Sequence, residues 1–406
     1  MTERADYAVV GGGPAGLAVA ILAALAGRRA VVVERRRGPV DKACGEGLMP
    51  PGVAWLRRME VEIAAARAHL FTGITYVDGE VTAEADFVEG PGLGIRRTEL
   101  VSAMRARAAA LGVQVLEGCR VATFVEHTDH VALETDRGQL EARWLVGADG
   151  LHGGVRTTAG FGVTAGKRRR HGVRRHFRLA PWSDRVDVHW IDGVEAYVTP
   201  VGPDTVGVAF LWSAAANRER SDYDAFLSRF PELRRRLGEV AAHPDTSVRG
   251  AGPFDVRVTP ISRGRVLLVG DASGYLDAIT GEGLSLAFAS AAALVEATAG
   301  DDASSYARAW TRLRRQHVAL TRLVLWIADH PALRRRVVRA LSRRPDAFRA
   351  FLALNTGAWG LGHALPGVLN LGVCLLGRGA ADPHQKGTSR IETRRPGPEH
   401  RPGPAH

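Results

Sequence analysis

The chain has 406 residues, of which 46% are hydrophobic and 24% are charged, and its formal net charge is +11. This length exceeds one simple core, so we expect two or three packed units, and the composition is that of a soluble globular protein, which excludes a disordered or fibrous chain. Nearly all of the positive charge is arginine, since the only lysines are Lys42, Lys167 and Lys386. Such a balance is compatible with a nucleic acid, an anionic membrane or an acidic ligand, and equally with a basic solvated surface.

The three cysteines, Cys44, Cys119 and Cys374, are few, odd in number and far apart. They argue against a disulfide framework and for a reducing compartment, and no Cys/His cluster indicates a metal site. We see no signal peptide and no uncharged apolar run long enough to span a bilayer. The expectation is a cytoplasmic protein, with peripheral contact at the inner face of the membrane left open.

The first predicted unit is a strand, a helix and a second strand. Residues 6–10 (DYAVV) form a short apolar run, GGGPAG follows, and an alanine-leucine segment continues to Ala26. Gly27 is suited to the helix stop, and residues 30–34 (AVVVE) form a second buried run. This order is that of one βαβ unit.

The remaining elements are predicted from periodicity and from glycine and proline. We expect a helix over 53–68, strands over 71–95, a helix over 97–111, a strand over 113–118 and a β-meander over 121–146. Further on we expect antiparallel strands over 172–213, a helix over 222–240, a buried strand over 264–274, a helix from Gly283 and mostly helix over 303–378. The last 26 residues, 381–406, are rich in Pro, Gly and polar residues, and we expect them to be disordered.

The glycine-rich turn has the spacing of a dinucleotide-binding loop. Gly11 allows the tight turn, Gly13 allows a pyrophosphate to approach the backbone, and Gly16 allows the helix and strand to pack closely. The helix N-terminus offers unpaired amides and a positive dipole end to phosphates. Glu34 ends the second strand, where its carboxylate can accept hydrogen bonds from ribose hydroxyls.

Two later segments repeat the pattern of a buried strand followed by a glycine turn. They are LVGADGLHGGVR (145–156) and GRVLLVGDASG (264–274). With GxGxxG, these DG and GD motifs make the chain resemble the para-hydroxybenzoate-hydroxylase-fold FAD-dependent oxidoreductases over residues 5–380. That superfamily includes aromatic monooxygenases and geranylgeranyl reductases. The resemblance implies FAD as the cofactor.

The resemblance also implies an architecture. The fold class is α/β, with a Rossmann-like FAD-binding domain, an inserted mixed or antiparallel β-sheet substrate domain and a helical C-terminal region. The expected bounds are 1–75, 96–160 and 252–300 for the FAD-binding domain, 76–95 and 161–251 for the substrate-binding domain, 301–380 for the helical region and 381–406 for the tail.

The cofactor-binding residues are carried over motif by motif. Asp271 would accept from ribityl hydroxyls, and the helix that follows Gly281-Glu282-Gly283 would stabilise negative charge on the reduced flavin. Gly153 and Gly154 stand where the family often has serine, which puts one hydroxyl contact in doubt. The expected cofactor-binding set is Gly11, Gly13, Pro14, Ala15, Gly16, Glu34, Arg35, Cys44, Gly45, Arg97, Val121, Asp149, Gly150, Asp271, Gly281, Gly283 and Leu284.

Two reactions remain open. No second GxGxxG and no partner for Cys44 in its segment disfavour the two-nucleotide disulfide reductases. A monooxygenase would take hydride transiently from NAD(P)H and hydroxylate an aromatic ring through a C4a-hydroperoxyflavin. Its candidate bases are His176, His189 and Tyr197, each of which can equally be an ordinary sheet residue. A geranylgeranyl-reductase-type enzyme would instead reduce C=C bonds of a prenyl chain.

The segment DKACGEGLMPPG (41–52) bears on this choice. ACGEGLMP looks like the Cys-Gly-Glu/Gly-Gly-Leu segment of the reductases, but Tyr197-Val198-Thr199-Pro200 lacks the tryptophan of their aromatic motif. The whole segment resembles actinobacterial flavoproteins of type III polyketide, phenolic-lipid pathways, which implies secondary metabolism and hydroxylation of an alkylresorcinol-like ring. We therefore favour the monooxygenase, with O2 and a hydrophobic or aromatic small molecule as its partners.

Several minor alternatives stay open at this point. A halogenase-like relative would need a lysine along a tunnel, and only Lys42 is near a predicted flavin segment. An oxidase, a protein electron donor and a non-catalytic flavoprotein are the others. Cys44 is a further candidate for a catalytic side chain, as a proton donor or substrate contact, and its alternative is packing against the flavin.

Three arginine clusters could form an interaction surface: 167–175, 233–237 and 333–344. None is interleaved with aromatic residues or belongs to a known reading module, so no nucleic acid is expected. The third has Val, Leu and Ala between its arginines, which is typical of a helix on anionic lipid and also of a core-packing helix with one solvated face.

Overall fold

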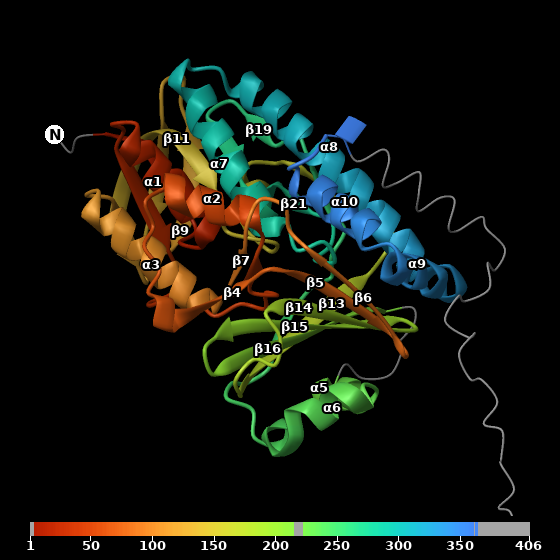
Figure 1. Cartoon of the computed structure of the whole chain (residues 1–406). Coiled ribbons are helices and arrows are strands. Elements are labelled where there is room, and N and C mark those ends of the chain that lie inside the picture. Colours follow the sequence, from red (N-terminus) through yellow and green to blue (C-terminus); the bar gives the residue numbers. More distant parts are fainter. Residues whose placement is uncertain (1–3, 215–221, 361, 364–406) are drawn as a thin grey trace, which may run out of the picture.

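The computed structural model describes residues 4–214, 222–360, 362 and 363. Figure 1 shows two sheets, one above the other, with the last helices of the chain along one side of both. The upper half contains the N-terminal elements, and the lower half contains the strands from the middle of the chain. The boundary between the halves is where the functional site is found.

The first sheet contains β1 (Ala5–Val10), β2 (Ala30–Glu34), β8 (Gln114–Glu117), β9 (Val121–Glu126), β10 (Val131–Thr135), β11 (Gly138–Gly147), β19 (Ser262–Arg263) and β20 (Val266–Leu268). Its path is β19-β20-β11-β1-β2-β8, and β10 and β9 continue from β11 as an antiparallel meander. The central strands β20, β11, β1, β2 and β8 are parallel. The apolar runs of β1, β2 and β20 reflect burial on both faces.

Helices cover this sheet. They are α1 (Pro14–Leu25), α2 (Pro50–Arg58), α3 (Arg97–Ala110), the short α4 (Val155–Thr158) and α7 (Gly283–Ala299). α1 lies between α3 and α7 and is apolar almost all round, as a helix buried among neighbours must be. The predicted βαβ unit and the α/β fold class are confirmed.

The predicted helix over 53–68 is wrong at both ends, since α2 begins at Pro50 and ends at Arg58. Prolines are tolerated in the first turn because the amide there has no partner within the helix. Glu60 has φ of 54°, a left-handed conformation that a right-handed helix does not continue. The chain then extends into the strand that starts at Ala68.

The predicted helix over 222–240 is divided into α5 (Tyr223–Ser228), α6 (Pro231–Leu237) and a 3₁₀ turn (Gly238–Ala242). The division follows from Pro231, which has no N–H to continue the helix before it and takes the first position of the next one.

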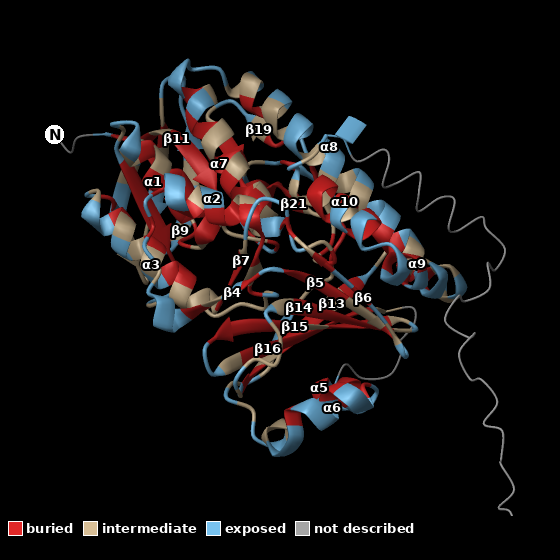
Figure 2. Ribbon diagram, viewed as in Figure 1, coloured by how far each residue is buried: buried red, intermediate tan, exposed pale blue. Residues whose placement is uncertain are grey.

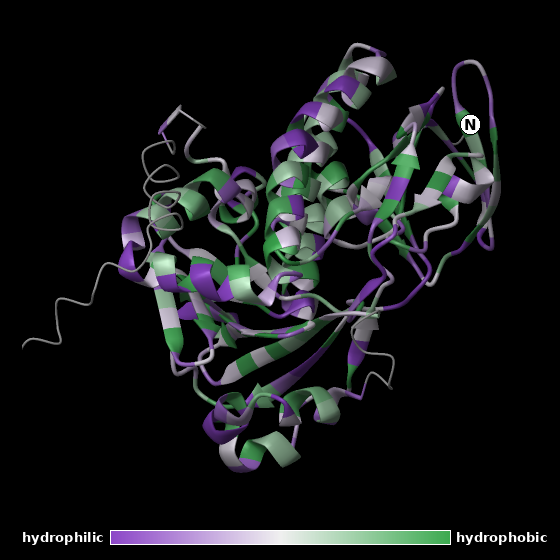
Figure 3. Ribbon diagram, turned by 90° about the vertical axis from the view of Figure 1, so that its right-hand side faces the viewer, coloured by the Kyte–Doolittle hydropathy of each residue, from purple (hydrophilic) through white to green (hydrophobic). Residues whose placement is uncertain are grey.

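The second sheet contains β5 (Gly73–Asp78), β6 (Val81–Asp86), β13 (Arg170–Arg178), β14 (Arg185–Ile191), β15 (Val194–Gly202), β16 (Thr205–Ser213) and β17 (Arg249–Ala251). Its order is β17-β13-β16-β15-β14-β5-β6, antiparallel except where β14 pairs with β5. Figures 1 and 3 show from two sides that this sheet separates α5 and α6 from the rest of the molecule. Each strand therefore turns alternate side chains towards α5 and α6 or towards the upper half.

Two small sheets join the halves. One contains β3 (Gly47–Leu48), β4 (Ala68–Phe71) and β7 (Gly92–Ile95), and the other β12 (Gly162–Ala165), β18 (Val256–Thr259) and β21 (Gly274–Tyr275). Two further 3₁₀ turns are Ala65–Arg67 and Gly270–Ser273. The strands predicted over 71–95, 121–146 and 172–213 are thus present.

Among the described residues, α7 is followed by α8 (Ala303–Ala328), α9 (Pro331–Arg343) and α10 (Pro345–Thr356). In the part of the chain that the structure describes, no helix is both long and apolar enough to cross a membrane. The end of the predicted helical region, 364–380, and the predicted disordered tail, 381–406, lie outside the described residues. The division of the chain into domains at the bounds given above stays a prediction.

Candidate active site

Two adjoining cavities lie at the carboxyl ends of the parallel strands, between the two sheets. Both are lined by Gly13, Lys42, Arg97 and Gly150, so they form one continuous space. Pro14, Ala15, Cys44, Gly45, Asp271, Gly281, Gly283 and Leu284 line the inner cavity, and Gly11, Glu34, Arg35, Val121 and Asp149 line the outer groove. Every predicted cofactor-binding residue except Gly16 therefore lies on this space.

Gly16 lies beneath the site instead, where helix and strand meet. A Cβ atom at this position would lie 2.0 Å from the Gly11 carbonyl oxygen and 3.1 Å from Val9 Cγ1. At Gly11, whose φ is 118°, a Cβ would lie 2.4 Å from the Ala148 carbonyl oxygen. Only glycine fits either position, and this close approach sets the N-terminus of α1 against the outer groove.

We expect Gly16→Ala to lower the FAD content of the purified protein by about tenfold, since the new methyl group would displace α1 from β1. Overpacking of this kind also lowers the free energy of unfolding by roughly 1–3 kcal/mol. Flavin absorbance per protein and urea-induced unfolding measure the two effects.

The matched control is Gly154→Ala in the DG turn, where φ is −83° and nothing lies within 4 Å of the new Cβ. Normal FAD content in Gly16→Ala, or equal loss in both variants, would contradict the assignment of a packing role to Gly16.

The end of α1 that faces the groove has no side-chain cap. Gly13 is its N-cap residue in extended conformation, so the first-turn amides are left for a ligand. Glu34 lies beside them, and its carboxylate accepts from the amides of Gly12 (2.8 Å) and Arg36 (2.9 Å). Both oxygens keep further lone pairs, so the carboxylate is held in place and can still accept from hydroxyl groups.

Asp271 follows β20 and pairs with Lys42, whose Nζ lies 2.7 Å from Asp271 Oδ2. Burial alone would raise the pKa of Asp271, but Lys42, together with Arg97, outweighs burial and holds this pKa below its usual value. The carboxylate is thus charged and able to accept from sugar hydroxyls. The sequence did not assign Lys42 to the cofactor; its place two residues before Cys44 was the available signal.

Asp149 carries an unused acceptor. Its Oδ2 accepts from the Val155 amide at 3.0 Å, while its buried Oδ1 has no partner among the described residues. Burial raises the pKa of Asp149, and the hydrogen bond from the Val155 amide offsets this in part. Free helix amides, two strand-end carboxylates and an unpaired acceptor form the donor and acceptor set that a dinucleotide needs, so these residues fit FAD.

The loop 41–47 is anchored by Glu46, a residue that sequence reasoning left without a role. Glu46 is 3% exposed and has φ of 60°. Its Oε1 accepts from the Arg97 amide (2.8 Å), and its Oε2 lies 2.5 Å from His176 Nε2. Because these partners come from α3 and β13, Glu46 joins the loop 41–47 to both halves of the molecule.

Arg174 supports the same loop from β13. Its Nη2 lies 2.6 Å from Asp41 Oδ1 and 3.2 Å from the Lys42 carbonyl oxygen. Arg174 is 1% exposed. The middle of the arginine cluster 167–175 is therefore buried structure rather than an interaction surface.

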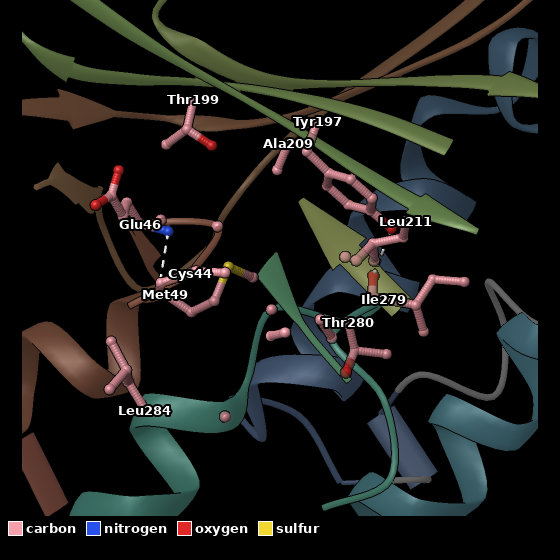
Figure 4. A pocket seen from close by; sticks show the side chains of 18 of the residues that line it. Cys44, Glu46, Met49, Tyr197, Thr199, Ala209, Leu211, Ile279, Thr280 and Leu284 are labelled. Atoms are coloured by element: carbon pink, nitrogen blue, oxygen red, sulfur yellow. Dashed lines mark hydrogen bonds between the residues drawn. The ribbon is translucent and has the colours of Figure 1, made fainter. Parts of the chain in front are cut away.

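The inner cavity widens into an apolar chamber on the face of the second sheet. Figure 4 shows Tyr197, Thr199, Ala209 and Leu211 on the sheet side. Opposite them lie Cys44 from the loop, Met49 at the start of α2, and Ile279 and Thr280 from the segment before α7. The rest of the chamber wall includes Phe71, Ile74, Tyr76, Val186, Val188, Phe351, Leu352 and Asn355. The charged side chains of the cavity, such as Lys42, Arg97 and Asp271, come from the segments that carry the predicted cofactor-binding residues and from their supports.

Of the three candidate bases, the structure brings only Tyr197 to the cavity. His176 lies behind the loop against Glu46. His189 lies on β14 between Val188 and Trp190 and is turned the other way, where burial and Arg236 lower its pKa to about 4. Tyr197 donates to the Ile279 carbonyl oxygen (3.2 Å), and burial raises its pKa well above the usual value, so it is a neutral donor rather than a base.

Asn355 of α10 contributes a second polar group to the chamber. Its Nδ2 donates to the Thr280 carbonyl oxygen at 3.2 Å, and its buried Oδ1 has no partner among the described residues. An unpaired buried acceptor is costly, and a ligand hydroxyl at this point would satisfy it. The sequence offered no signal for this residue.

Cys44 lies on the chamber wall, and its Sγ accepts from the Glu46 amide at 3.4 Å. Cys44 and Cys119 are both free thiols, and Cys374 lies outside the described residues.

The chain is similar to a protein family, to several proteins of known activity and to solved structures. The family model described as "FAD binding domain" matches residues 4–302. The chain is 28% identical over 348 residues to a menaquinone reductase of Mycolicibacterium smegmatis, across 79% of this chain and 82% of that protein. It is 30% identical over 314 residues to a para-nitrophenol 4-monooxygenase of a Pseudomonas species, across 71% and 76%. The solved structure of a flavoprotein/dehydrogenase from Cytophaga hutchinsonii has the same fold, with a TM-score of 0.78, 18% identity and coverage of 92% and 99%.

Proposed function

The chain belongs to the FAD binding domain family and is a FAD-dependent oxidoreductase; from this premise we propose that it is an NAD(P)H-dependent monooxygenase. Its substrate in this proposal is an aromatic, phenolic molecule with a lipid tail. The chemistry that FAD supplies when bound is hydride uptake from NAD(P)H and transfer of an oxygen atom from O2.

The cofactor would be held by residues of the continuous cavity. The amides at the start of α1 would bind the pyrophosphate, Glu34 the ribose and Asp271 the ribityl hydroxyls. α7 begins at Gly283 without a side-chain cap, so its free amides and positive dipole end are available to negative charge at the flavin. The fold itself holds Glu34 through the amides of Gly12 and Arg36 and Asp271 through Lys42, which is the arrangement that electrostatic stabilisation needs.

One observation carries the proposed substrate: the chamber is apolar but contains the unpaired acceptor Asn355 Oδ1. A phenol presents a hydroxyl donor on an apolar ring, so it can satisfy this acceptor while its ring and tail contact the apolar wall. A hydrocarbon chain would leave the acceptor unpaired. The apolar wall would also keep water away from the reacting atoms.

We expect Asn355→Leu to lower kcat/KM for a phenolic substrate by up to about tenfold, the loss of one neutral hydrogen bond, while FAD content stays normal. Steady-state kinetics and flavin absorbance measure these two quantities. The control is Thr356→Val, one residue further along α10 and outside the cavity wall. An unchanged kcat/KM in Asn355→Leu would contradict the proposed contact between Asn355 and the substrate.

A second candidate function is a reductase of the geranylgeranyl-reductase type that acts on C=C bonds of a prenyl chain. The observation that favours it is the match to a menaquinone reductase over 82% of that protein. Such a reaction needs a proton donor beside the flavin, and the thiol of Cys44 lies on the chamber wall.

Replacement of Cys44 separates the two functions. In a monooxygenase Cys44 would be a packing residue, so we expect Cys44→Ala and Cys44→Ser to keep FAD content and to change turnover by less than about threefold. Removal of a general acid would instead lower turnover by roughly a hundredfold or more at normal FAD content. The second result would give Cys44 a catalytic role and favour the reductase.

The proposed function is tested with the purified yellow protein, NADH or NADPH and a resorcinol-type lipid, with and without O2. Oxygen-dependent oxidation of NAD(P)H that the lipid stimulates, with a hydroxylated product in mass spectrometry, is expected. Saturation of a prenyl chain under anaerobic conditions would assign the reductase function instead. A protein that does not take up FAD would contradict both.

A further inference from the structure

The positive charge of the chain is concentrated in its last described helices. Residues 303–356, which include α8, α9 and α10, contain twelve arginines and two aspartates. They therefore carry ten of the eleven net positive charges of the whole chain. The helices follow one another along one side of the molecule (Figure 1).

Most of this charge is exposed and unpaired. Arg314 and Arg334 are directed inward, whereas the other ten arginines are exposed: Arg308, Arg312, Arg315, Arg322, Arg335, Arg336, Arg339, Arg343, Arg344 and Arg349. Among the described residues, Arg308 is the one member of this group with a carboxylate partner, Asp302. Figure 2 shows the outer sides of α8 and α9 as exposed. A surface with so many uncompensated cations is suited to an extended anionic partner.

Apolar side chains interrupt the basic surface on α8. Leu313, Leu323 and Trp326 are 37%, 46% and 49% exposed, and Trp326 is the one exposed large aromatic side chain in the described part of the chain. Leu323 and Trp326 lie three residues apart, so they share a face of the helix with each other. Arg322 lies next to Leu323 and is exposed as well.

The apolar side of α9, unlike the exposed apolar residues of α8, is packed against the rest of the protein and is not exposed to solvent. Val338 and Leu341 are buried in the core cluster that includes Ala83 and Ala85 of β6. Arg334 of the same helix is buried against Asp78, with its Nε 2.8 Å from Asp78 Oδ2. The segment 333–344 is thus a core-packing helix with a solvated basic face, and α8 supplies the exposed apolar groups.

We propose that the outer face of α8–α10 docks on an anionic lipid surface. The exposed arginines would contact lipid phosphates, and Leu323 and Trp326 would enter the boundary between headgroups and acyl chains, where tryptophan is favoured. Phe351, Leu352 and Asn355, on the inward side of α10, line the inner cavity, so one of the docked helices also forms a wall of the substrate chamber. The docking does not depend on which reaction the site performs.

Flotation of the full-length, FAD-loaded protein with lipid vesicles tests the proposal. We expect binding to vesicles that contain phosphatidylglycerol, little binding to pure phosphatidylcholine vesicles, and at least tenfold weaker binding when NaCl is raised from about 50 mM to about 500 mM. The triple variant Arg322→Gln, Arg335→Gln, Arg339→Gln should bind roughly a hundredfold more weakly, because each arginine near such a surface contributes about fivefold.

A charge-matched control carries Arg57→Gln, Arg58→Gln and Arg234→Gln, three exposed arginines on α2 and α6. It should bind vesicles as the unchanged protein does. For the apolar groups, Leu323→Ser with Trp326→Ser should weaken binding by about tenfold, while Leu70→Ser with Val125→Ser, two residues that are 57% and 55% exposed elsewhere, should not.

Four results would overturn the proposal: no vesicle binding, equal binding to neutral vesicles, equal losses in both arginine triples, or no effect of the Leu323 and Trp326 substitutions. In a competition experiment, double-stranded DNA or RNA is added to the vesicle-bound protein, and the fraction of protein released from the vesicles is measured. Tighter binding to a nucleic acid through the same three arginines would assign this face to that partner and not to lipid.

Discussion

Replacement of Arg170 by methionine should lower the free energy of unfolding by about 3–5 kcal/mol, because it leaves two buried carboxylates without their cation. Arg170 lies on β13 and binds Glu195 of β15 through both Nη atoms, at 3.2 and 2.6 Å. Its Nε donates to Asp277 Oδ2 at 2.9 Å. Burial raises the pKa values of Glu195 and Asp277, and Arg170 opposes this rise in both.

The same ion triad fixes the segment that borders the site. Asp277 Oδ1 accepts from the Ile279 amide (3.0 Å), and the Ile279 carbonyl oxygen accepts from Tyr197 (3.2 Å). This segment leads to Gly281 and Gly283, which line the inner cavity. A loss of flavin affinity should therefore accompany the loss of stability in the Arg170 variant.

Urea-induced unfolding measures the first effect, and Arg178→Met is the control. Arg178 lies on the same strand and pairs with Asp204, but its side chain is 72% exposed, so its loss should cost less than about 1 kcal/mol. Adding Glu195→Gln and Asp277→Asn to Arg170→Met should recover part of the stability, since no buried charge then remains unpaired. Equal costs for Arg170 and Arg178 would show that the triad does not stabilise the fold.

The cofactor half of the molecule could be predicted because its signals are local. Gly11, Gly13 and Gly16 lie within six residues of one another, and each has a steric or backbone role that the residue type alone reveals. The position of Glu34 could be predicted because it ends the second strand of one βαβ unit, at a typical distance from the glycines. The pairing of β1 with β2 follows from the same spacing.

The partners of buried charges could not be predicted, since they are distant in the chain. Arg170 and Asp277 are separated by 107 residues, and Arg334 and Asp78 by 256. In the sequence, Arg170 and Arg334 look like members of surface arginine clusters. Which arginine of a cluster turns inward depends on the register of a strand or the rotation of a helix against its neighbours.

For the second sheet, the sequence also could not predict which side chains face the cavity. His189 and Tyr197 lie on the adjacent strands β14 and β15. Tyr197 pairs with Val188, the residue before His189, so Tyr197 and His189 face opposite sides of the sheet. Alternation predicts that neighbouring residues differ in direction but does not tell which side holds the cavity. Asn355 was missed for a different reason, because it belongs to a helix whose docking position no local pattern specifies.

Raising the pH should destabilise this protein through Glu282, and Glu282→Gln should remove that loss. Glu282 precedes α7, is 6% exposed, and its Oε1 has no partner among the described residues. Burial raises the pKa of Glu282 to about 8 from the usual 4.5, and Ser285 opposes this only in part. Between these two values the folded chain keeps a proton that the unfolded chain has released, so the free energy of unfolding falls as pH rises.

The loss should reach up to about 5 kcal/mol by pH 9, since each unit of pKa difference corresponds to about 1.4 kcal/mol. Glutamine has the same shape and is neutral at every pH, so the variant should match the unchanged protein near pH 5 and exceed its stability at pH 9. Comparison of the two proteins in urea at both pH values cancels the contributions of all other groups. Glu296→Gln, at an exposed position of the same helix, should leave the profile unaltered. Parallel pH profiles for the unchanged protein and Glu282→Gln would mean that Glu282 is ionised in the folded protein. Its negative charge would then partly neutralise the positive end of α7 beside the proposed flavin site.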